Sequence, residues 1–437
     1  MSRNMWLFSL FSVALLLSGC SSTGETESET TLGFDLVFKQ DRVLEVAISV
    51  DAGFDAMIAQ YLNDGQIPYY AATFQFEGEE PMDQVGFRLK ADVRDGPGKS
   101  EPKYSLKINF NEFGQERFYR IDQLHFGDNK PDPSLMRETL STRAYRAMGV
   151  PTNRTAYAWV TVDDEEPTLY TMRQDIDKRF IKDWYGTALG VDDGNLYKCS
   201  PPGCNLTWKG SSRSDYVDTS CGEPSGCGLI LQTNEEDPQL NDYSDLINFL
   251  NIVNNVSPED FPEAIEAVFD VDTFLKYLAV AVVISDYDGY IGSVDNFFLY
   301  HRPDTGRFVY IPWDMNKSYG KKKCDFAVDE TGVNPSVPWC DDEARPLLYR
   351  ILSVPEFVDR YEGYLAQVLD DVFTVDKQQQ WVDEADSLIS DFVEADTNSY
   401  VTFAAYKLAV SGEDTGTNPM PIIRFVETRR AFLLDHL

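Results

Sequence analysis

The stretch from residue 272 to residue 285 is apolar on nearly every side of the helix that it predicts. Its large apolar side chains run from Phe274 to Ile284, so the helix has no polar face. Such a helix is stable only when other parts of the protein surround it. We therefore expect the chain to fold around this helix, with Asp272 as its N-cap. The segment 285–295 is expected to form a loop directly after it.

A β-hairpin is predicted immediately after this loop. Two runs of aromatic and β-branched residues, at 297–300 and 307–313, flank the turn sequence Pro303-Asp304-Thr305-Gly306. In a hairpin the residue before the first strand lies beside the residue after the second strand, so Asn296 and Asp314 are expected at the same end. Their oxygen atoms, with a carboxylate of the preceding loop, suit Mg²⁺ or Mn²⁺ when phosphates complete the coordination.

The order of these elements points to phosphoryl transfer. A buried helix, a loop Asp, Asn296, a hairpin and Asp314 follow one another as in the protein kinases, which hold two Mg²⁺ ions and place a catalytic Asp in this way. Lys107, on the polar face of the predicted strand 104–110, is placed to hold nucleotide phosphates. The alternative for the loop is that 286–289 forms an ordinary turn or a calcium loop.

Strands are predicted in the first half of the chain. Alternating apolar and polar residues at 87–93 and 104–110 indicate paired antiparallel strands. The further elements expected here are a helix that Asp132-Pro133 opens and Gly149-Val150-Pro151 closes, and strands at 155–162 and 169–172. The sequence therefore predicts a sheet-rich lobe over about 33–185.

Helices dominate the prediction for the last part of the chain, 241–437. They are expected at 243–254, 260–269, 272–285, 346–351, 357–373, 381–392 and 421–437. Between the two parts, 186–240 is rich in Gly, Ser, Pro and Asp, and we assign it no regular core. Strands first and helices later predict an α+β fold with an antiparallel sheet lobe, a mainly helical lobe and a cleft between them.

Six cysteines follow residue 190, and an even number in an exported chain indicates disulfides. Sequence neighbours suggest the pairs Cys199–Cys204, Cys221–Cys227 and Cys324–Cys340, although six cysteines allow 15 connectivities. The alternative is a zinc site. No pair has the tight spacing that zinc sites prefer, and the chain has three His.

The N-terminus resembles that of a bacterial lipoprotein. Residues 1–19 combine a basic start, a short apolar run and small residues before Cys20, which is typical of a secretory signal with a lipidated Cys. A bare signal-peptidase site is the alternative. Ser21 favours the outer membrane, and residues 20–32 are expected to be a flexible tether.

The charge of the chain excludes one class of partner. Lys and Arg number 38 and Asp and Glu 72, which gives a net charge of −34. Nucleic-acid binding requires clustered basic side chains, so we expect no nucleic acid as a partner. Apolar residues make up 43% of the chain, enough for a large folded core.

Several motifs, in this order, resemble the CotH (spore coat protein H) kinases, a family of secreted or surface-exposed atypical protein kinases. The resemblance covers about 33–437. The motifs are Phe87-Arg88-Leu89-Lys90, Pro102-Lys103-Tyr104-Ser105-Leu106-Lys107-Ile108, the Arg137 helix ending in Gly149-Val150-Pro151, Asp177-Lys178-Arg179-Phe180, Gly194-Asn195-Leu196-Tyr197-Lys198, Asp288-Gly289, Asn296-Phe297-Phe298-Leu299-Tyr300 and Ile311-Pro312-Trp313-Asp314.

By matching position, the resemblance implies an atypical protein-kinase-like two-lobe fold, with Lys107 at the phosphates of ATP, Asp288 as the catalytic Asp, and Asn296 and Asp314 as metal ligands. Lys198 is a second candidate for the phosphates, and the alternative is that it covers the insert. The sequence departs from the family pattern at three places: Asp295 precedes Asn296 after a longer loop, and Asn316 and Gln174 stand where the family often has Asp and Glu.

The resulting hypothesis is a lipid-anchored exported kinase that transfers the γ-phosphoryl group of ATP to Ser or Thr of exported or surface proteins, with Mg²⁺ or Mn²⁺. One alternative is a surface binding or scaffolding protein that keeps the kinase fold and binds Ca²⁺ in its acidic loops. Another keeps the nucleotide and transfers AMP instead.

Overall fold

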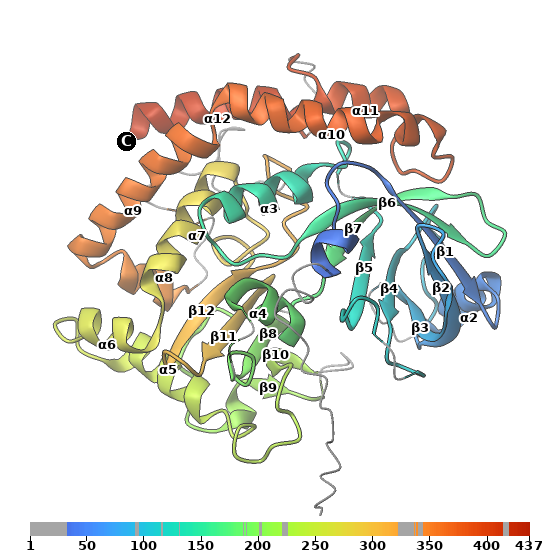
Figure 1. Ribbon diagram of the computed structural model, residues 1–437. Coiled ribbons are helices and arrows are strands. Elements are labelled where there is room, and N and C mark those ends of the chain that lie inside the picture. The colour runs from blue at the N-terminus through green and yellow to red at the C-terminus, as the bar shows by residue number, and fades with distance from the viewer. Residues whose placement is uncertain are drawn as a thin grey trace, which may run out of the picture.

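The computed structural model describes residues 33–437, except for 92–95, 115–116, 131, 187, 189, 201–202, 221–225, 322–335, 337, 340–343 and 414–418. It has two lobes, with a strand-rich lobe formed by the first part of the chain and a larger lobe in which helices surround a second sheet (Figure 1). The α+β class with a sheet lobe before a mainly helical lobe is thus confirmed.

The N-terminal lobe is a closed barrel rather than the simple antiparallel sheet that we predicted. Its strands follow the order β1-β2-β3-β4-β5-β7-β6. The strands are β1 (Leu44–Val50), β2 (Tyr70–Phe76), β3 (Met82–Lys90), β4 (Ser105–Asn109), β5 (Gln123–Gly127), β6 (Thr155–Val162) and β7 (Thr168–Gln174). The barrel closes because β1 pairs in parallel with β6, with Leu44 opposite Ala158. Closure removes the free edges that an open sheet would have.

The alternating side chains of the barrel strands fill its interior. In β1 every second residue is buried, and the same alternation in β4 buries Leu106 and Ile108. Phe74, Phe110 and Phe118 pack against one another, with ring centroids 5.1–5.2 Å apart. The intervening polar residues of β3, β4 and β5 therefore lie on the outside of the barrel wall.

The prediction that 186–240 lacks a regular core is wrong. This segment supplies three strands, β8 (Leu196–Ser200), β9 (Val217–Asp218) and β10 (Cys227–Leu231), to a second sheet of order β12-β11-β8-β10-β9. Strands β11 (Phe297–Arg302) and β12 (Arg307–Pro312) form the predicted hairpin. Lys198 in β8 pairs with Phe298 in β11. Strand β8 also pairs with β10 inside the insert. The three strands are short and lie between Gly-, Ser- and Pro-rich turns, so the composition of the insert did not reveal them.

Helix α7 (Val271–Ile284) is the centre of the larger lobe, as predicted. Ten of its side chains between Phe274 and Ile284 are buried. The predicted cap is wrong, because Asp270 caps the helix by accepting from the amide of Thr273 at 3.0 Å. Asp272 instead pairs with Lys276 at 2.8 Å on the helix surface. Within the part of the chain that the structure describes, no helix is long and apolar enough to cross a bilayer.

The other helices wrap around α7 and reach the barrel. They are α2 (Phe54–Asp64), α3 (Arg137–Ala147), α4 (Lys178–Tyr185), α5 (Ser244–Asn255), α6 (Phe261–Val268), α8 (Pro346–Ile351), α9 (Pro355–Gln367), α10 (Val375–Ala395), α11 (Phe403–Val410) and α12 (Ile422–His436). A π-helical turn, Val368–Val372, continues α9. Helix α3 begins at Arg137, later than predicted, because Asp132 accepts from the amide of Arg137 at 2.8 Å and holds the preceding residues in a turn.

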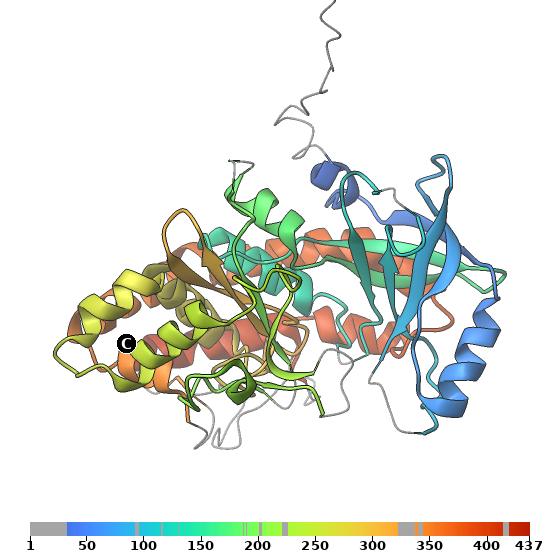
Figure 2. The ribbon, with the colours of Figure 1, turned by 90° about the horizontal axis from the view of Figure 1, so that it is seen from below.

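Helices α10, α11 and α12 extend across both lobes (Figures 1 and 2). Trp159 of the barrel packs on Phe392 of α10, with ring centroids 5.3 Å apart. Just after α10, Asp396 accepts from the amide of Leu169 at 3.0 Å and from the Thr168 hydroxyl at 2.6 Å. The buried ammonium of Lys103 lies 3.5 Å from Asp396. The C-terminal helices thus fix the barrel against the larger lobe.

Candidate active site

A cavity of about 850 Å³ lies between the outside of the barrel and the second sheet. From the barrel, Arg88 and Lys90 at the end of β3 line it. From the second sheet, its lining includes Lys198 of β8 and the two predicted metal ligands, Asn296 and Asp314, at the end of the hairpin. Cationic and oxygen-bearing side chains from the two lobes therefore face one space.

The hairpin brings Asn296 and Asp314 to one end, as predicted. The amide of Trp313 donates to the carbonyl of Asn296 at 3.0 Å, directly before the Asp. Asn296 and Asp314 both have left-handed backbone conformations, with φ of 55° and 57°. The short polar side chains of Asn and Asp tolerate this conformation. Backbone in this region often occurs at functional sites, because the surrounding structure must hold it there.

The loop carboxylate of Asp288 joins this end of the hairpin. The Asn296 amide donates to the Asp288 carbonyl at 2.9 Å and to its carboxylate at 3.2 Å. Lys317 donates to the same carboxylate at 2.8 Å. Burial alone would lower the pKa of Lys317, but the hydrogen bond to Asp288 raises it above its usual value. Lys317, three residues after Asp314, was not among the predicted site residues.

Neighbouring groups hold the loop in place and direct Asp286 and Asp288 to different partners. Arg345 is fully buried and donates to the Tyr290 carbonyl at 3.0 Å. Asp286 turns towards the core, where it accepts from the Tyr145 hydroxyl at 2.7 Å. Asp286 and Asp288 therefore bind different parts of the protein, an arrangement unlike a loop whose carboxylates converge on one calcium ion.

Asp314 also has a partner in the barrel. Arg173 of β7 donates to its carboxylate at 2.9 Å and lies 3.7 Å from Glu138 of α3. Burial would raise the pKa of Asp314, but Arg173 and Lys90 lower it below its usual value. Glu138 is 3% exposed, and burial raises its pKa to about 7. The sequence analysis missed Arg173 and Glu138, because their contacts join segments far apart in the chain.

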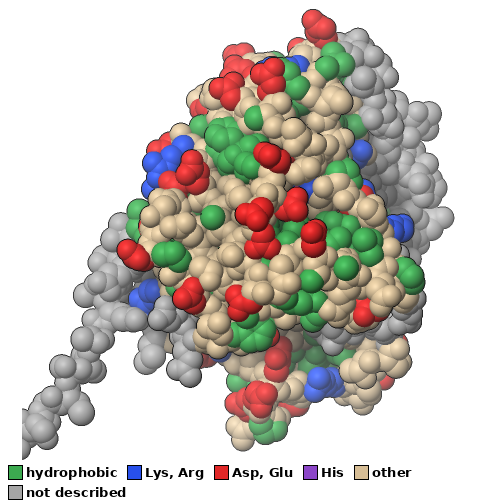
Figure 3. Space-filling model, turned by 90° about the vertical axis from the view of Figure 1, so that its right-hand side faces the viewer, with side chains coloured by type: hydrophobic (Ala, Val, Ile, Leu, Met, Phe, Trp, Pro, Cys, Tyr) green, Lys and Arg blue, Asp and Glu red, His purple; other side chains and the backbone are tan. Residues whose placement is uncertain are grey.

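A row of basic residues crosses the outside of the barrel. In register across neighbouring strands, Arg88 lies opposite Lys107, Lys107 opposite His125, and His125 opposite Arg173. Elsewhere, on the barrel side of the molecule, Asp and Glu gather near the middle of the face and Lys and Arg lie mostly towards its margins (Figure 3). The basic row is therefore a local feature of a strongly acidic protein.

Lys107, the predicted phosphate ligand, is ion-paired within this row. Its ammonium lies 3.7 Å from the carboxylate of Asp175, and His125 Nε2 lies 3.1 Å from the other oxygen. Burial would raise the pKa of Asp175, but Lys107 and His125 hold it well below its usual range. The neighbouring Gln174 points elsewhere, to the Arg154 amide and to Asp183. Lys107 lies on the polar face of β4, as predicted, but is not among the residues that line the cavity.

Lys90 and Lys198 do line the cavity. The ammonium of Lys90 lies 5.4 Å from the centre of the Trp313 ring, and burial, followed by Arg173, lowers its pKa to about 7. Burial also lowers the pKa of Lys198. Among the described residues, neither lysine has a carboxylate within 4.0 Å. Lys90 could have been found from the sequence, since it follows Arg88 by two residues on the same face of a strand.

One predicted disulfide is confirmed. Cys199 and Cys204 are bonded, with their Cα atoms 5.7 Å apart, and the amide of Cys204 donates to the Val294 carbonyl at 2.6 Å. Cys227 is also disulfide-bonded. The remaining cysteine predictions lie outside the described residues: Cys20, Cys221, Cys324 and Cys340. The confirmed bridge braces the loop that carries Asp288 and Asn296.

The donor set at the hairpin end fits a divalent cation that also binds phosphates. In the described part of the chain, no three His, Cys, Asp or Glu side chains are close enough to hold a metal ion by themselves. Asp288, Asn296 and Asp314 offer hard oxygen donors, and Arg173 occupies one oxygen of Asp314. Mg²⁺ is commonly bound by one or two carboxylates together with substrate phosphates, so this small set matches that mode of binding.

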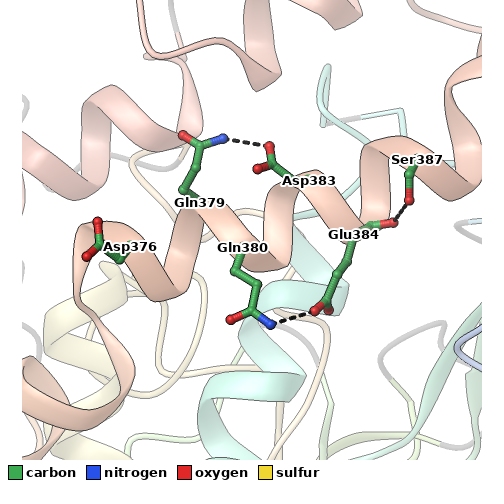
Figure 4. Close-up of a pocket in the computed structure, with 6 residues that line it drawn as sticks. All are labelled: Asp376, Gln379, Gln380, Asp383, Glu384 and Ser387. Carbon is green, nitrogen blue, oxygen red and sulfur yellow. Dashed lines mark hydrogen bonds between the residues drawn. The ribbon is translucent and has the colours of Figure 1, made fainter.

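A second hollow, on α10, has a different character (Figure 4). The side chains that line it bond along the helix, with Gln379 donating to Asp383 at 2.7 Å and Gln380 to Glu384 at 2.9 Å. Arg143 also pairs with Glu384 at 2.8 Å. These contacts are those of a solvated helix surface, and the hollow carries no group that the chemistry of the first cavity needs.

A cavity between two lobes, with Asn296, Asp314 and the neighbouring Asp288 on one side and Arg88 and Lys90 on the other, defines a protein-kinase-like phosphotransferase. The chain belongs to the CotH kinase family, since the family described as "CotH kinase protein" matches residues 95–433. This match covers Asp288, Asn296 and Asp314. Residues 33–94, which include β1 to β3, precede it.

Two relatives extend the comparison. The inner spore coat protein H of Bacillus subtilis (strain 168) is 26% identical over 337 residues, which cover 77% of this chain and 83% of that protein. The invasin CotH3 of Rhizopus delemar is 20% identical over 270 residues, 60% of this chain and 41% of that protein. A solved structure of the Helicobacter pylori proinflammatory kinase CtkA covers 76% of this chain and 95% of its own, with 10% identity and a TM-score of 0.29. That score is too low to transfer any site.

Proposed function

We propose that the protein transfers the γ-phosphoryl group of ATP to Ser or Thr of exported or surface proteins. The observation that supports this most is the meeting of Asp288 with Asn296 and Asp314, two residues that line a cavity of about 850 Å³ whose opposite wall carries Arg88 and Lys90. Family membership supports the kinase chemistry, and the acceptor proteins are part of the proposal.

Each residue of the hairpin end has a proposed role. Asp288 accepts the proton of the acceptor hydroxyl as the hydroxyl oxygen bonds to the γ-phosphorus. The bond between that phosphorus and the bridging oxygen breaks, and ADP leaves. Lys317 and Asn296 hold the Asp288 carboxylate by hydrogen bonds of 2.8 Å and 3.2 Å. Asn296 and Asp314 would hold Mg²⁺ or Mn²⁺, which when bound neutralises charge on the phosphates.

The location is proposed from the sequence of 1–32. The mature protein is a lipoprotein anchored through Cys20, most simply in the outer membrane of a bacterium, and a polar tether links the anchor to the kinase domain. Dual acylation is sufficient for stable anchoring. The test is membrane fractionation of cells that express Cys20→Ser. We expect this variant to leave the membrane fraction, and its retention there would contradict the lipid anchor.

The catalytic proposal is tested by phosphoryl transfer from labelled ATP with Mn²⁺ to casein as a generic acceptor and to the chain itself. Asp288→Ala and Asp314→Ala should each abolish transfer. Asp304→Ala is the matched control, because Asp304 is an exposed carboxylate at the opposite end of the same hairpin. Transfer that persists in the first two variants at the level of the control would show that the assigned mechanism is wrong.

Two other outcomes identify the alternatives. Calorimetry that detects Ca²⁺ binding, with no binding of ATP and Mn²⁺, would favour a binding protein on a kinase scaffold. Mass spectrometry of the modified acceptor separates phosphate transfer from AMP transfer, because the two added groups differ in mass.

A further inference from the structure

The lysines at the cleft fall into two kinds. Lys107 has its charge satisfied, with Asp175 at 3.7 Å, and Asp175 in turn contacts His125 at 3.1 Å. Lys90 and Lys198 line the cavity and have no carboxylate within 4.0 Å among the described residues. A half-buried ammonium without an acidic partner is costly to keep charged. It is therefore the better candidate for binding an anion that enters the cavity.

The surroundings of Lys90 strengthen this conclusion. Burial lowers the pKa of Lys90 most, and Arg173, Lys198 and Lys107 lower it further, whereas Asp314 on the hairpin raises it. Glu138 of α3 also faces this group of charges. The Lys90 ammonium lies over the face of the Trp313 ring, 5.4 Å from the ring centre. A bound anion would relieve the repulsion among these cations.

Position on the strand explains why the two lysines differ. Lys90 is the last residue of β3 and lines the cavity, whereas Lys107 lies in β4 opposite Arg88, two residue pairs from the end of β3, and does not line it. The hairpin end with Asp314 lies beside Lys90, since both Lys90 and Arg173 lie near the Trp313 ring. Phosphates held by a cation on Asn296 and Asp314 would therefore meet Lys90 first.

We infer that Lys90, and not Lys107, is the barrel residue that binds the nucleotide phosphates, with Lys198 as its partner on the second sheet. Lys107 is then a positioning residue, which holds Asp175 where the chain leaves β7. This inference rests on the proposed function, because it assumes that a nucleotide occupies the cavity. Lys90 precedes the part of the chain that matches the family, so the match assigns it no role.

The experiment is calorimetric titration of the full chain with ATP and Mn²⁺, and separately with adenosine. Lys90→Met should weaken ATP binding about tenfold or more, the loss expected for a charge-assisted hydrogen bond. Lys90→Arg should bind ATP within about threefold of wild type, since the charge remains. Lys107→Met should also keep ATP affinity within about threefold, although its melting temperature without ligand should fall.

Adenosine provides the control for a purely structural effect. It carries no phosphate, so Lys90→Met should bind adenosine as wild type does. Equal losses for ATP and adenosine would overturn the inference, as would a loss of ATP binding in Lys107→Met as large as that in Lys90→Met. Unchanged ATP binding in Lys90→Met would overturn the inference and leave the proposed function standing. Failure of the wild-type chain to bind ATP with Mn²⁺ would overturn both.

Discussion

The two walls of the cleft differ in charge and in how they are built. The barrel wall is basic, and its row of Arg88, Lys107, His125 and Arg173 comes from strands paired side by side. The opposite wall supplies oxygen donors, and these come from one hairpin end and the loop before it. The acidic wall is therefore continuous in sequence, whereas the basic wall exists only when the barrel is closed.

Because the two walls differ in this way, we expect them to have separate roles in the reaction. Oxygen donors and a proton acceptor on the hairpin suit the chemical step and the metal ion, and the cations on the barrel suit the negative charge of the nucleotide. Arg173 is the exception, since it reaches from the barrel to Asp314 at 2.9 Å. Substitutions on the hairpin should lower kcat, and substitutions on the barrel should lower the affinity for ATP or the stability of the fold.

The largest expected effect is on the hairpin side. Asp288→Asn removes the proton acceptor and keeps the shape of the side chain, so kcat should fall by about 10²–10⁴-fold. Binding of ATP with Mn²⁺ should stay within about threefold of wild type. Steady-state kinetics and calorimetry measure the two quantities. A variant that loses binding while its kcat is unchanged would reverse the division of tasks between the walls.

The second effect concerns the residue that joins the walls. Arg173→Met leaves Asp314 and Glu138 without their shared cation, and breaking a buried ion pair in this way costs about 3 kcal/mol. Denaturant unfolding measures the loss as a lower midpoint at unchanged slope. Arg88→Met is the matched control, since it is in the same row but packs on the Tyr69 ring. Equal stability in both variants would show that Arg173 does not link the lobes.

The disulfide gives a third test, specific to the acidic wall. Replacing Cys199 and Cys204 together by Ser should lower stability by about 2 kcal/mol, the chain-entropy value for so short a loop. Because the bridge braces Val294, the variant should lose kcat more than ATP affinity. Thermal unfolding measures the change in stability, and kinetics of the same preparation measure the changes in kcat and in ATP affinity. Equal losses of affinity and kcat would indicate that the bridge supports both walls.

The last test is a pH dependence, which changes stability only within one pH window. The pKa of Glu138 is raised from 4.5 to about 7, so between these pH values the folded chain holds this proton more tightly than the unfolded chain. Its contribution to stability therefore falls as pH rises through that window. Glu138→Gln should gain stability relative to wild type by about 1–3 kcal/mol between pH 5 and pH 8. Exposed Glu394→Gln should show no such change.

The sequence analysis predicted best those features of the fold that depend on residues close together in the chain. The buried helix and the hairpin are continuous patterns, so the meeting of Asn296 and Asp314 followed from the turn alone. Strand β8 was missed because it is short and lies in a turn-rich segment, and one of its two partners, β11, comes from a distant part of the chain. The closing of the barrel by β1 and β6 was missed because these two strands are far apart in the chain. Glu138, Arg173 and Asp314 meet only after three separate segments of the chain have packed together.

For Lys107, the sequence analysis predicted the strand and its polar face correctly but did not predict the contacts of the side chain. Its strand and its polar face were predicted, and the structure places both as expected. No local pattern indicated that Asp175, at the end of β7, would take up its charge. Which lysine stays available to a ligand depends on tertiary neighbours, and a single sequence does not reveal these.

The contact between Lys103 and Asp396 has a consequence for a chain that is cut in its C-terminal part. Lys103 comes just before β4, and Asp396 follows α10, so a chain cut before Asp396 would keep all seven barrel strands and lose this carboxylate. The Lys103 ammonium would keep the Leu169 carbonyl as its acceptor but lose its counter-charge, and the Leu169 amide and the Thr168 hydroxyl would lose their acceptor. Cleavage in the C-terminal helices is therefore expected to destabilise the barrel, although it leaves every barrel strand in place.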